Sequence, residues 1–553
     1  MEIIDQHVKK IMEGCKKRAR DAGLTFDNET LEYIVTNRDM LELSPKVMIP
    51  TLYDYWVHDV KVLSGKGMYE LYPGNPYETV INTRPAISFY NDNNPDWLNV
   101  MIFYHVLGHI DFFQNNLFFS HTWDYDFTGQ ALSDKRIIAR YRSEKGRWVD
   151  YVIEFARGVD NIIGYQNQLS RRFSENGRKN ICKLDYYFDV FLQQEKKESQ
   201  NTFLKEIERY NTLKKENTDF QENMFFSEVI AKHPEFEAMF QKNLEKKEKK
   251  KLDVMEYIIQ NSALLKKEEN QWMKSVIEIV RETSLFFQPQ IRTKTINEGW
   301  ASFWHETLFM QDNRIKGHET DFAKVNATVT SMPKVGLNPY ALGMRLLYHI
   351  RDMGDRGCYS FDYFFQRDEV KRKKYNNTAY QGRGMDLLFA VRENMCDFTF
   401  VNQFIDQDFV NRHRLFVSGK RLNRAKMAWE YYVKSRNADD YRDMIIDTLY
   451  HPPVITVDHE KTQHGPLYLI HKFEGKPLKK DFINNTMVGI EYLWGGPVKL
   501  ETFEPVKDPS GSKPGVDFWH PSFPAQPKKE KPSVTWKKVL YIMGDRKLQK
   551  REM

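Results

Sequence analysis

The stretch WLNVMIFYHVLGHIDFFQNNLFF, residues 97–119, decides how the rest of the chain is interpreted. Its apolar residues leave no polar face wide enough for water, so it predicts a helix that is buried on most sides. His105 and His109 lie inside it, four residues apart, which places both imidazoles on one face of that helix. A buried polar ring is costly unless something satisfies it. A shared metal ion would satisfy both rings.

A second stretch, NEGWASFWHETL at residues 297–308, offers further ligands. Glu298 and His305 are seven residues apart, so they also share one face of a helix. Two such helices could bring four ligand-type side chains to one ion. The simpler alternative is that these histidines are core residues bonded to backbone carbonyls, because HxxxH is a common pattern. The glutamate that makes HExxH diagnostic is absent, since Val106 follows the first histidine.

Length and composition limit the class of protein. A chain of 553 residues can form two to four domains with substantial cores. The 82 basic and 76 acidic residues leave a net charge of +6, which is too mild to indicate a nucleic-acid partner. The four cysteines lie far apart and form no CxxC pair, so neither a disulfide framework nor a zinc–thiolate site is indicated.

The sequence predicts a cytoplasmic protein. The first residues, MEIIDQHVKKIMEGCKKRARDAG, are charged throughout and contain no apolar core of an export signal. The apolar runs are interrupted by polar residues before they reach the roughly 20 residues that a membrane span needs. Residues 1–65 favour amphipathic helices, and residues 78–89 favour a short strand pair interrupted by Pro85.

Residues 148–169, WVDYVIEFARGVDNIIGYQNQL, have the 3.6-residue periodicity of a helix. The polar side chains on this stretch are most simply a solvated face. If the helix instead lines the site, Glu154 is the first carboxylate to consider as a catalytic group. Residues 185–275 are rich in Lys and Glu, which predicts a solvated, charged helical excursion away from the functional region.

The last third of the chain changes its hydrophobic period. Strands are predicted at 429–435, 454–459, 466–473 and 497–503, and helices at 439–449 and 480–494. The order β-α-β-β-α-β is that of a ferredoxin-like unit. We therefore predict a mainly α protein, α+β overall, with a helical domain at 1–425, a ferredoxin-like α/β domain at 426–503 and an extended basic tail at 504–553.

Four longer motifs carry a resemblance to a known family. In chain order they are HVLGHIDFFQNNLFF, FFQPQIRTKTINEGWASFWH, DFAKVNATVTSMPKVGLNPYALGMRLL and FAVRENMCDFTFVNQF. Together they resemble the SpoVR family, the stage V sporulation protein R-like proteins, from about residue 50 to 405. His105 and His109 match the family's first motif, and Glu298 and His305 match its second. The resemblance favours the metal site, because the family's motifs share these ligand-type residues.

The resemblance implies a biological setting more than a reaction. The family is associated with formation of the spore cortex, a peptidoglycan layer. Its members also occur in bacteria that do not sporulate, often encoded beside a serine protein kinase and a von Willebrand A-type protein, which are therefore the implied partners.

Two classes of function remain open. The first is a metal-dependent hydrolase or amide-transferring enzyme of zincin-like geometry, in which His105 and His109 bind zinc or iron. Glu298 is then a ligand or a catalytic acid/base, and His305 is either a further ligand or an acid/base. The second class is a non-enzymatic assembly or signalling protein in which the histidines only stabilise a helical core.

Overall fold

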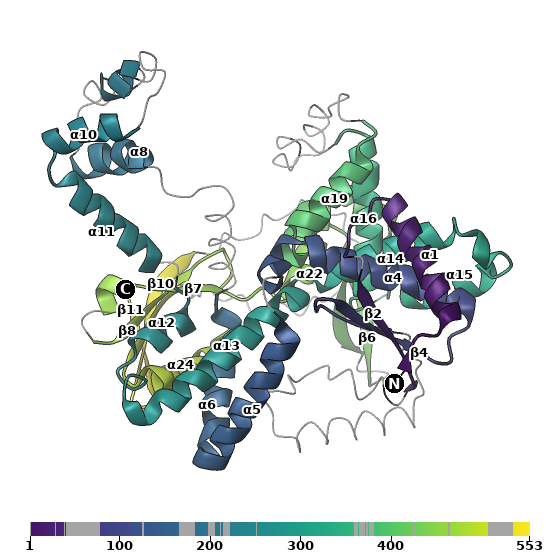
Figure 1. Ribbon diagram of the computed structural model, residues 1–553, viewed down its shortest axis with the longest axis horizontal. Helices are drawn as coiled ribbons and strands as arrows, with labels where there is room; N and C mark the ends of the chain where they lie inside the picture. Colours follow the sequence, from purple (N-terminus) through teal and green to yellow (C-terminus); the bar gives the residue numbers. More distant parts are fainter. Residues whose placement is uncertain are drawn as a thin grey trace. The chain divides into compact units, whose positions relative to one another are not determined.

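The computed structural model (Figure 1) describes residues 2–36, 78–123, 126–164, 183–196, 222–249, 252–358, 381–506 and 535–553, with breaks at 28, 334, 424–426 and 463–464 and some positions between these ranges. Helices predominate in these residues and are accompanied by three small sheets. The predicted mainly α, α+β class is confirmed. Of the amphipathic helices predicted for residues 1–65, α1 (Gln6–Asp21) is present, whereas Thr30–Val35 forms a strand and 40–65 lie outside the described residues.

The chain forms two compact units, and each unit combines two separate chain segments. Unit 1 comprises residues 1–146 and 282–452, and unit 2 comprises residues 147–281 and 453–553. The chain passes from unit 2 back to unit 1 between Arg281 and Glu282, inside the helix α13 (Gln271–Arg292). The predicted division near residue 425 is therefore wrong, because helices and strands from distant parts of the sequence pack together.

Unit 1 contains a four-stranded sheet of order β1-β2-β4-β3. The strands β2 and β4 are parallel, and the other two pairs are antiparallel. The predicted strand pair within residues 78–89 is confirmed as the antiparallel pair β3–β4. The strand bounds are β1 (Glu2–Ile3), β2 (Thr30–Val35), β3 (Glu78–Ile81) and β4 (Ala86–Asn91).

The helices of unit 1 surround α4 (Asp96–Asn115), in which every residue from Leu98 to Phe113 is buried. This burial follows from a sequence that is apolar on all sides. The helix α14 packs against both α4 and α16 (Figure 1). The remaining bounds are η1 (Leu117–Thr122), α5 (Phe127–Lys145), α14 (Lys294–Phe309), η5 (Asn313–Ile315), α15 (Glu319–Val329), α16 (Pro339–Asp355), α19 (Gly384–Asn394), α20 (Asp397–Phe404), α21 (Gln407–Arg412) and α22 (Ala438–Thr448).

Glycines allow these three helices to touch through their backbones. A Cβ added to Gly108 of α4 would lie 2.8 Å from the Cα of Ala301 on α14. A Cβ added to Gly299 of α14 would lie 2.4 Å from the backbone carbon of Gly343 on α16. Any larger residue would therefore push the helices apart. The close contact fixes the distance between the faces that carry His109 and Glu298.

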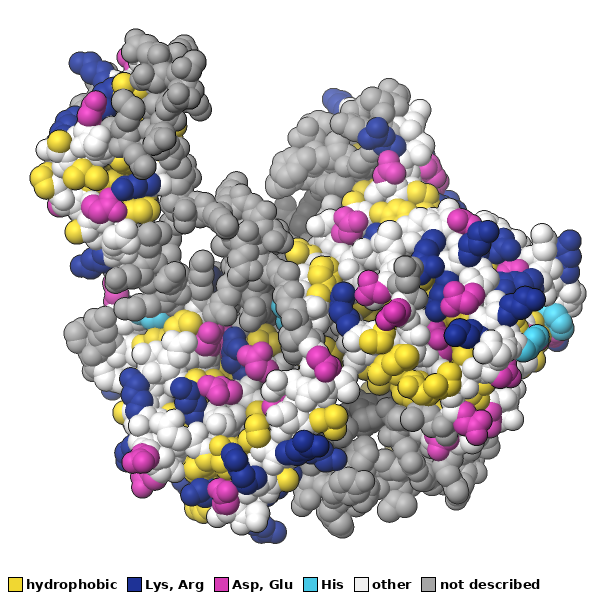
Figure 2. All heavy atoms as spheres, in the orientation of Figure 1, with side chains coloured by type: hydrophobic (Ala, Val, Ile, Leu, Met, Phe, Trp, Pro, Cys, Tyr) yellow, Lys and Arg dark blue, Asp and Glu magenta, His cyan; other side chains and the backbone are white. Residues whose placement is uncertain are grey.

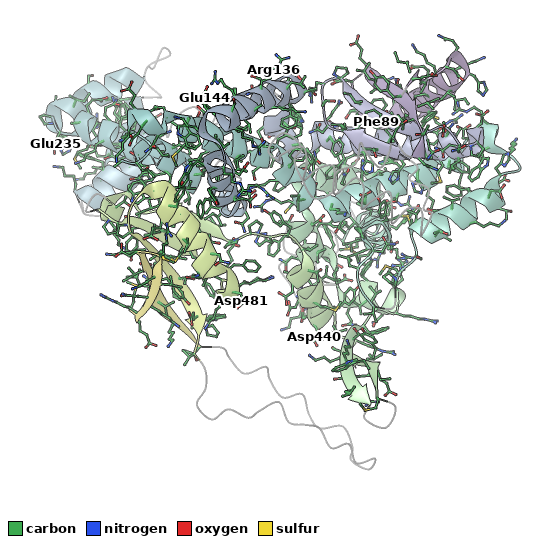
Figure 3. The ribbon with its side chains drawn as sticks, turned by 90° about the horizontal axis from the view of Figure 1, so that it is seen from below. Phe89, Arg136, Glu144, Glu235, Asp440 and Asp481 are labelled. Atoms are coloured by element: carbon green, nitrogen blue, oxygen red, sulfur yellow. The ribbon has the colours of Figure 1, made fainter. Side chains whose placement is uncertain are left out.

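The strand predicted at 429–435 is present, but it does not belong to a ferredoxin-like sheet. Among the described strands, β6 (Ala428–Ser435) pairs with β5 (Val417–Asn423) alone, in an antiparallel hairpin of unit 1. The following helix α22 also belongs to unit 1. Its Asp440 accepts a hydrogen bond of 2.7 Å from Ser435 at the end of β6, and Figure 3 shows this residue beside the hairpin.

Unit 2 contains a five-stranded sheet of order β11-β10-β9-β8-β7. Its strands β8 and β9 are parallel and joined by α24 (Lys480–Trp494), while the other neighbours are antiparallel. The predicted basic tail at 504–553 is corrected here, because its end supplies two strands of this sheet. The strand bounds are β7 (Val454–Val457), β8 (Leu467–Lys472), β9 (Val498–Pro505), β10 (Trp536–Gly544) and β11 (Lys547–Glu552).

A buried carboxylate ties the last strands to the rest of this sheet. Glu504 on β9 accepts hydrogen bonds from Lys480 of α24 at 3.0 Å, from Lys550 of β11 at 2.7 Å, and from the hydroxyl of Tyr541 on β10. Burial raises the pKa of Glu504, but these hydrogen bonds outweigh it and lower the pKa to about 2. The residues after 535 are therefore held by specific polar contacts as well as by the strand ladder.

The described parts of the predicted charged excursion at 185–275 are helical, as expected. The aromatic side chains of η3, α10 and α11 form a small apolar core of their own. The bounds in unit 2 are α6 (Trp148–Arg157), η2 (Asp160–Ile162), α8 (Lys183–Asp185), η3 (Tyr186–Glu195), α10 (Glu222–Lys232), α11 (Phe236–Lys249), α12 (Val254–Asn261), η4 (Glu268–Asn270) and α23 (His459–Thr462).

The surface matches the balanced composition of the sequence. Figure 2 shows basic and acidic side chains interspersed on the visible face of the described residues, without a large area of one sign. Within the described part of the chain, no helix is both long enough and apolar enough to cross a bilayer.

Candidate metal centre

Three side chains from α4 and α14 converge in the core of unit 1. His105 and His109 are 5% and 6% exposed, and their Nε2 atoms lie 3.1 Å apart. Glu298 of α14 faces them, with its Oε2 atom 3.9 Å from His105 Nε2 and 3.5 Å from His109 Nε2. The predicted meeting of the two helix faces is therefore present in the structure.

The spacing of these three atoms matches the size of a metal ion. The circle through the two Nε2 atoms and Oε2 has a radius of about 2 Å, which is the length of a zinc–nitrogen or zinc–carboxylate bond. One ion near the centre of this triangle could therefore contact all three atoms without a change of helix position. Among the described residues, this is the one group of three or more histidine, cysteine or acidic side chains with ligand atoms close enough to share an ion.

A chain of hydrogen bonds fixes which nitrogen of His105 carries the proton. Asn326 of α15 donates its amide to Glu306 at 2.7 Å, so its oxygen is left to accept from Nε2 of His305 at 2.9 Å. In a neutral ring, Nδ1 of His305 is then an acceptor, and it lies 2.9 Å from Nδ1 of His105. His105 therefore carries its proton on Nδ1, and the lone pair of its Nε2 points to the triangle.

A similar contact orients the second histidine. Nδ1 of His109 donates to the side-chain oxygen of Asn297 at 3.0 Å, which leaves the lone pair on its Nε2. The Oε2 atom of Glu298 is buried and has no hydrogen-bond donor among the described residues. Three lone-pair acceptors thus face one another, with no described donor to separate them. Such an arrangement is unfavourable unless a cation lies between them.

The surroundings also keep the imidazoles in the form that binds metals. Burial lowers the pKa of His105 well below its ordinary value, and the neighbouring His109 and His305 lower it further. Burial lowers the pKa of His305 to about 4, against the opposing effect of its hydrogen bond with Asn326. At neutral pH His105 and His305 are therefore uncharged, and the uncharged ring of His105 is the form that coordinates a metal.

Two buried aspartates lock the helices that carry the ligands. Asp111, two residues after His109, accepts hydrogen bonds from the indole of Trp300 at 2.8 Å and from the backbone of Thr25 at 2.7 Å. Arg392 adds an ion pair at 3.3 Å to the same carboxylate. These bonds fix the register of α4 against α14.

At the start of α14, the two oxygens of Asp397 accept from the backbone N–H groups of Thr295 and Ile296, both at 2.8 Å. The carboxylate satisfies donors that the first turn of a helix cannot satisfy by itself. The contact anchors the helix end that precedes Glu298.

A cavity of about 500 Å³ adjoins the histidines. His105 and His305 form part of its wall, and the ring of Tyr340 stacks on that of His105 with centroids 6.1 Å apart. Its volume falls in the range of about 300–1,000 Å³ that is typical of small-molecule sites. The cavity therefore gives room for a substrate on the His105 side of the candidate metal centre, and His109 and Glu298 are not among its described lining residues.

The predicted residues have different positions relative to this centre. His305 lies behind His105, with one ring nitrogen facing that ring and the other facing Asn326, so neither nitrogen points to the triangle. Glu154 lies in unit 2, where its side chain is 64% exposed and 3.4 Å from Arg157. Burial, and then the nearby Asp150, raise the pKa of Glu154, but no described contact connects it with the histidines.

Sequence reasoning missed the two asparagines that orient the rings. Asn297 stands directly before Glu298 in the second motif, and this position beside a predicted ligand could have indicated that Asn297 contacts the site. Asn326 comes from α15 and is 21 residues after His305 in the sequence, so no pattern within one helix relates the two residues and only the packing of α15 against α14 brings them together. The same holds for Asp111, which reads in the sequence as one polar residue in an apolar helix.

Comparison with known protein families matches residues 3–451 to the family described as SpoVR like protein. The chain belongs to the SpoVR family. This match includes all of the residues of the candidate metal centre and ends before β7. A curated relative, the "Uncharacterized protein YcgB" of Escherichia coli (strain K12), is 24% identical over 397 residues, which is 69% of each chain. No solved structure matches the chain.

Proposed function

We propose that this SpoVR-family chain is a metal-dependent enzyme with one zinc or iron ion held by His105, His109 and Glu298. The observation that carries the proposal is the convergence of three lone-pair atoms around a point about 2 Å from each, next to a cavity. Two histidines and one carboxylate with open positions are the ligand set of catalytic zinc and of non-haem iron enzymes. A closed structural site would have a fourth protein ligand, and His305 is turned away.

The reaction that we propose is hydrolysis or transfer at an amide bond. A bound ion of this kind supplies a polarised carbonyl or an activated water molecule. Other residues of the chain position the groups that take part. His305 orients the ring of His105, Asn297 orients the ring of His109, and the cavity keeps the reacting group beside His105. Glu298 is the carboxylate nearest to the reacting atoms, since Val106 replaces the glutamate of HExxH enzymes.

The family name supports a role linked to sporulation. The substrate class in keeping with this setting is peptidoglycan of the spore cortex, whose peptide stems contain the required amide bonds. The local chemistry of the centre fits such a bond, because it offers an electrophilic ion beside a largely apolar cavity rather than a phosphate-binding loop.

Metal analysis of the purified full-length chain tests the proposal. We expect one equivalent of zinc or iron per chain in the wild type and its loss in His105→Ala and His109→Ala. His349→Ala is the matched control, because His349 is also a buried helical histidine of unit 1 but contacts Asp406 instead. The control should keep the metal.

The variant Glu298→Gln separates the two roles of the carboxylate. Loss of the metal would make Glu298 a ligand, whereas a loaded but inactive variant would make it the acid/base. Activity is measured as new amine groups released from peptidoglycan fragments, detected by mass spectrometry. A folded wild-type chain that binds neither metal at micromolar concentration would contradict the proposal and favour the assembly or signalling alternative.

A further inference from the structure

The cavity beside the candidate metal centre has an uneven wall. Six of its lining residues are apolar or aromatic and come from α4, from the end of α15, from the loop before α16 and from the start of α16. They are Met101, Ile102, Val329, Leu337, Pro339 and Tyr340. Such a wall favours an aliphatic or aromatic body of a ligand and offers it few hydrogen bonds.

The polar groups of the wall are almost all engaged elsewhere. Asn338 donates to the carbonyls of Val329 and Ser331, and its oxygen accepts from the backbone of Tyr340 and Ala341. This side chain therefore has nothing left to offer a ligand. The rings of His105 and His305 are committed to each other and to the candidate metal centre.

Lys294 is the exception. It is the one charged side chain among the described lining residues, and it is exposed. No ion pair or hydrogen bond connects its ammonium group with any other described residue. Its position at the first residue of α14 adds the positive end of the helix, although Asp397 already occupies the next two backbone N–H groups. An ammonium that has no described partner at the wall of an apolar cavity favours the binding of an anionic group there.

The spacing along α14 relates this ammonium to the reacting centre. Lys294 and Glu298 are four residues apart, so they share a face and are separated by a rise of about 6 Å. Lys294 and His105 also line the same cavity, so one ligand in that cavity can contact both side chains.

We propose that the substrate is a short peptide or acylated amino acid with a free carboxylate, which Lys294 binds in the cavity while the amide reacts beside His105 at the metal centre. This inference rests on the proposed function. In the reaction, the hydroxyl of water adds to the carbonyl carbon, the C–N bond breaks, and the amine leaves with the proton of that water. The fragment that carries the original free carboxylate is therefore released as the amine product.

Binding tests the inference independently of catalysis. The probes are N-acetyl-leucyl-alanine and its C-terminal amide, added to the full-length chain and followed by calorimetry. We expect the wild type to bind the acid about tenfold more tightly than the amide, as a charged hydrogen bond provides. Lys294→Gln should remove this preference, and Lys294→Arg should keep part of it. Lys324→Gln, an exposed lysine of α15, is the matched control.

Turnover adds a second readout on the metal-loaded chain. We expect Lys294→Gln to raise KM for acids of this class with little change in kcat, and to retain its metal. A wild type that binds the acid no better than the amide would overturn the inference, whether or not hydrolysis is observed. Loss of metal in Lys294→Gln would also overturn it, because Lys294 would then support the centre rather than the substrate. Acid-selective binding without any turnover would refute only the proposed hydrolysis.

Discussion

The contact between Gly299 and Gly343 makes the strongest prediction about how fold and site depend on each other. In Gly299→Ala the new methyl group would lie 2.4 Å from the carbonyl carbon and 2.5 Å from the Cα of Gly343. Ordinary carbon–carbon contacts are about 3.5–4.0 Å, so the overlap exceeds about 1 Å. Both partners are backbone atoms, and no side-chain rotation can relieve the overlap. The helices α14 and α16 must separate.

The expected cost follows from this geometry. Overpacking costs about 1–3 kcal/mol, and a rigid backbone contact belongs at the upper end of that range. The gain in helix propensity from glycine to alanine returns up to about 1 kcal/mol. We therefore expect Gly299→Ala to lose about 2 kcal/mol of unfolding free energy. Because Glu298 is the preceding residue, the same shift should weaken metal binding at least about tenfold.

Urea unfolding and a metal titration of the full-length chain measure the two effects. Gly129→Ala is the matched control, since Gly129 also lies in a helix, α5, and its nearest neighbour is the carboxylate of Asp126 at 2.5 Å, which can rotate away. The control should be as stable as the wild type or slightly more stable. If Gly299→Ala unfolds at the wild-type urea concentration and binds metal equally well, the close contact does not hold the site.

Three further predictions concern single side chains. His305→Ala should weaken metal binding about 10- to 100-fold without abolishing it, because this residue orients His105; competition with a chelator measures the change, and complete loss would make His305 a ligand. Asp111→Ala should cost about 3–5 kcal/mol in urea unfolding, since it leaves the buried donors of Trp300 and Thr25 unsatisfied and removes the buried partner of the Arg392 guanidinium, which keeps only Glu393 among the described acidic residues; a cost below about 1 kcal/mol would contradict this role. The lowered pKa of Glu504, about 2, stabilises the folded chain above pH 4.5, and this contribution of up to about 3 kcal/mol is lost as the pH falls from 4.5 towards 2. Glu504→Gln should therefore flatten that part of the stability–pH curve, and an unchanged curve would mean that the buried carboxylate does not titrate as proposed.

The position of the candidate centre was predictable because it depends on local patterns. The spacing of His105 and His109 and the face shared by Glu298 and His305 follow from helix geometry alone. What each side chain does was not predictable in the same way. The direction of the His305 ring depends on Asn326, a residue of another helix, so the sequence could not separate a ligand from the residue that orients it.

The fold shows the same division between local and distant information. Most helices and strands of the last third were predicted close to their observed bounds, because period and turn residues are local signals. The pairing of β6 with β5 was not predicted, because the alternation of apolar and polar residues along one strand does not indicate which strand it pairs with. The strands β10 and β11 were missed because the Pro- and Lys-rich sequence before them is typical of a tail.

The interleaving of the two units has a consequence for how the chain is made. His105 and His305 are 200 residues apart in the sequence, and all of the first segment of unit 2 lies between them. At about 5–20 residues per second, synthesis leaves α4 without α14 for on the order of 10–40 s. During that time α4, the most apolar of the described helices, has no partner for the face that carries its histidines. The nascent chain must therefore shelter this helix, by transient collapse or by a chaperone, before the centre can exist.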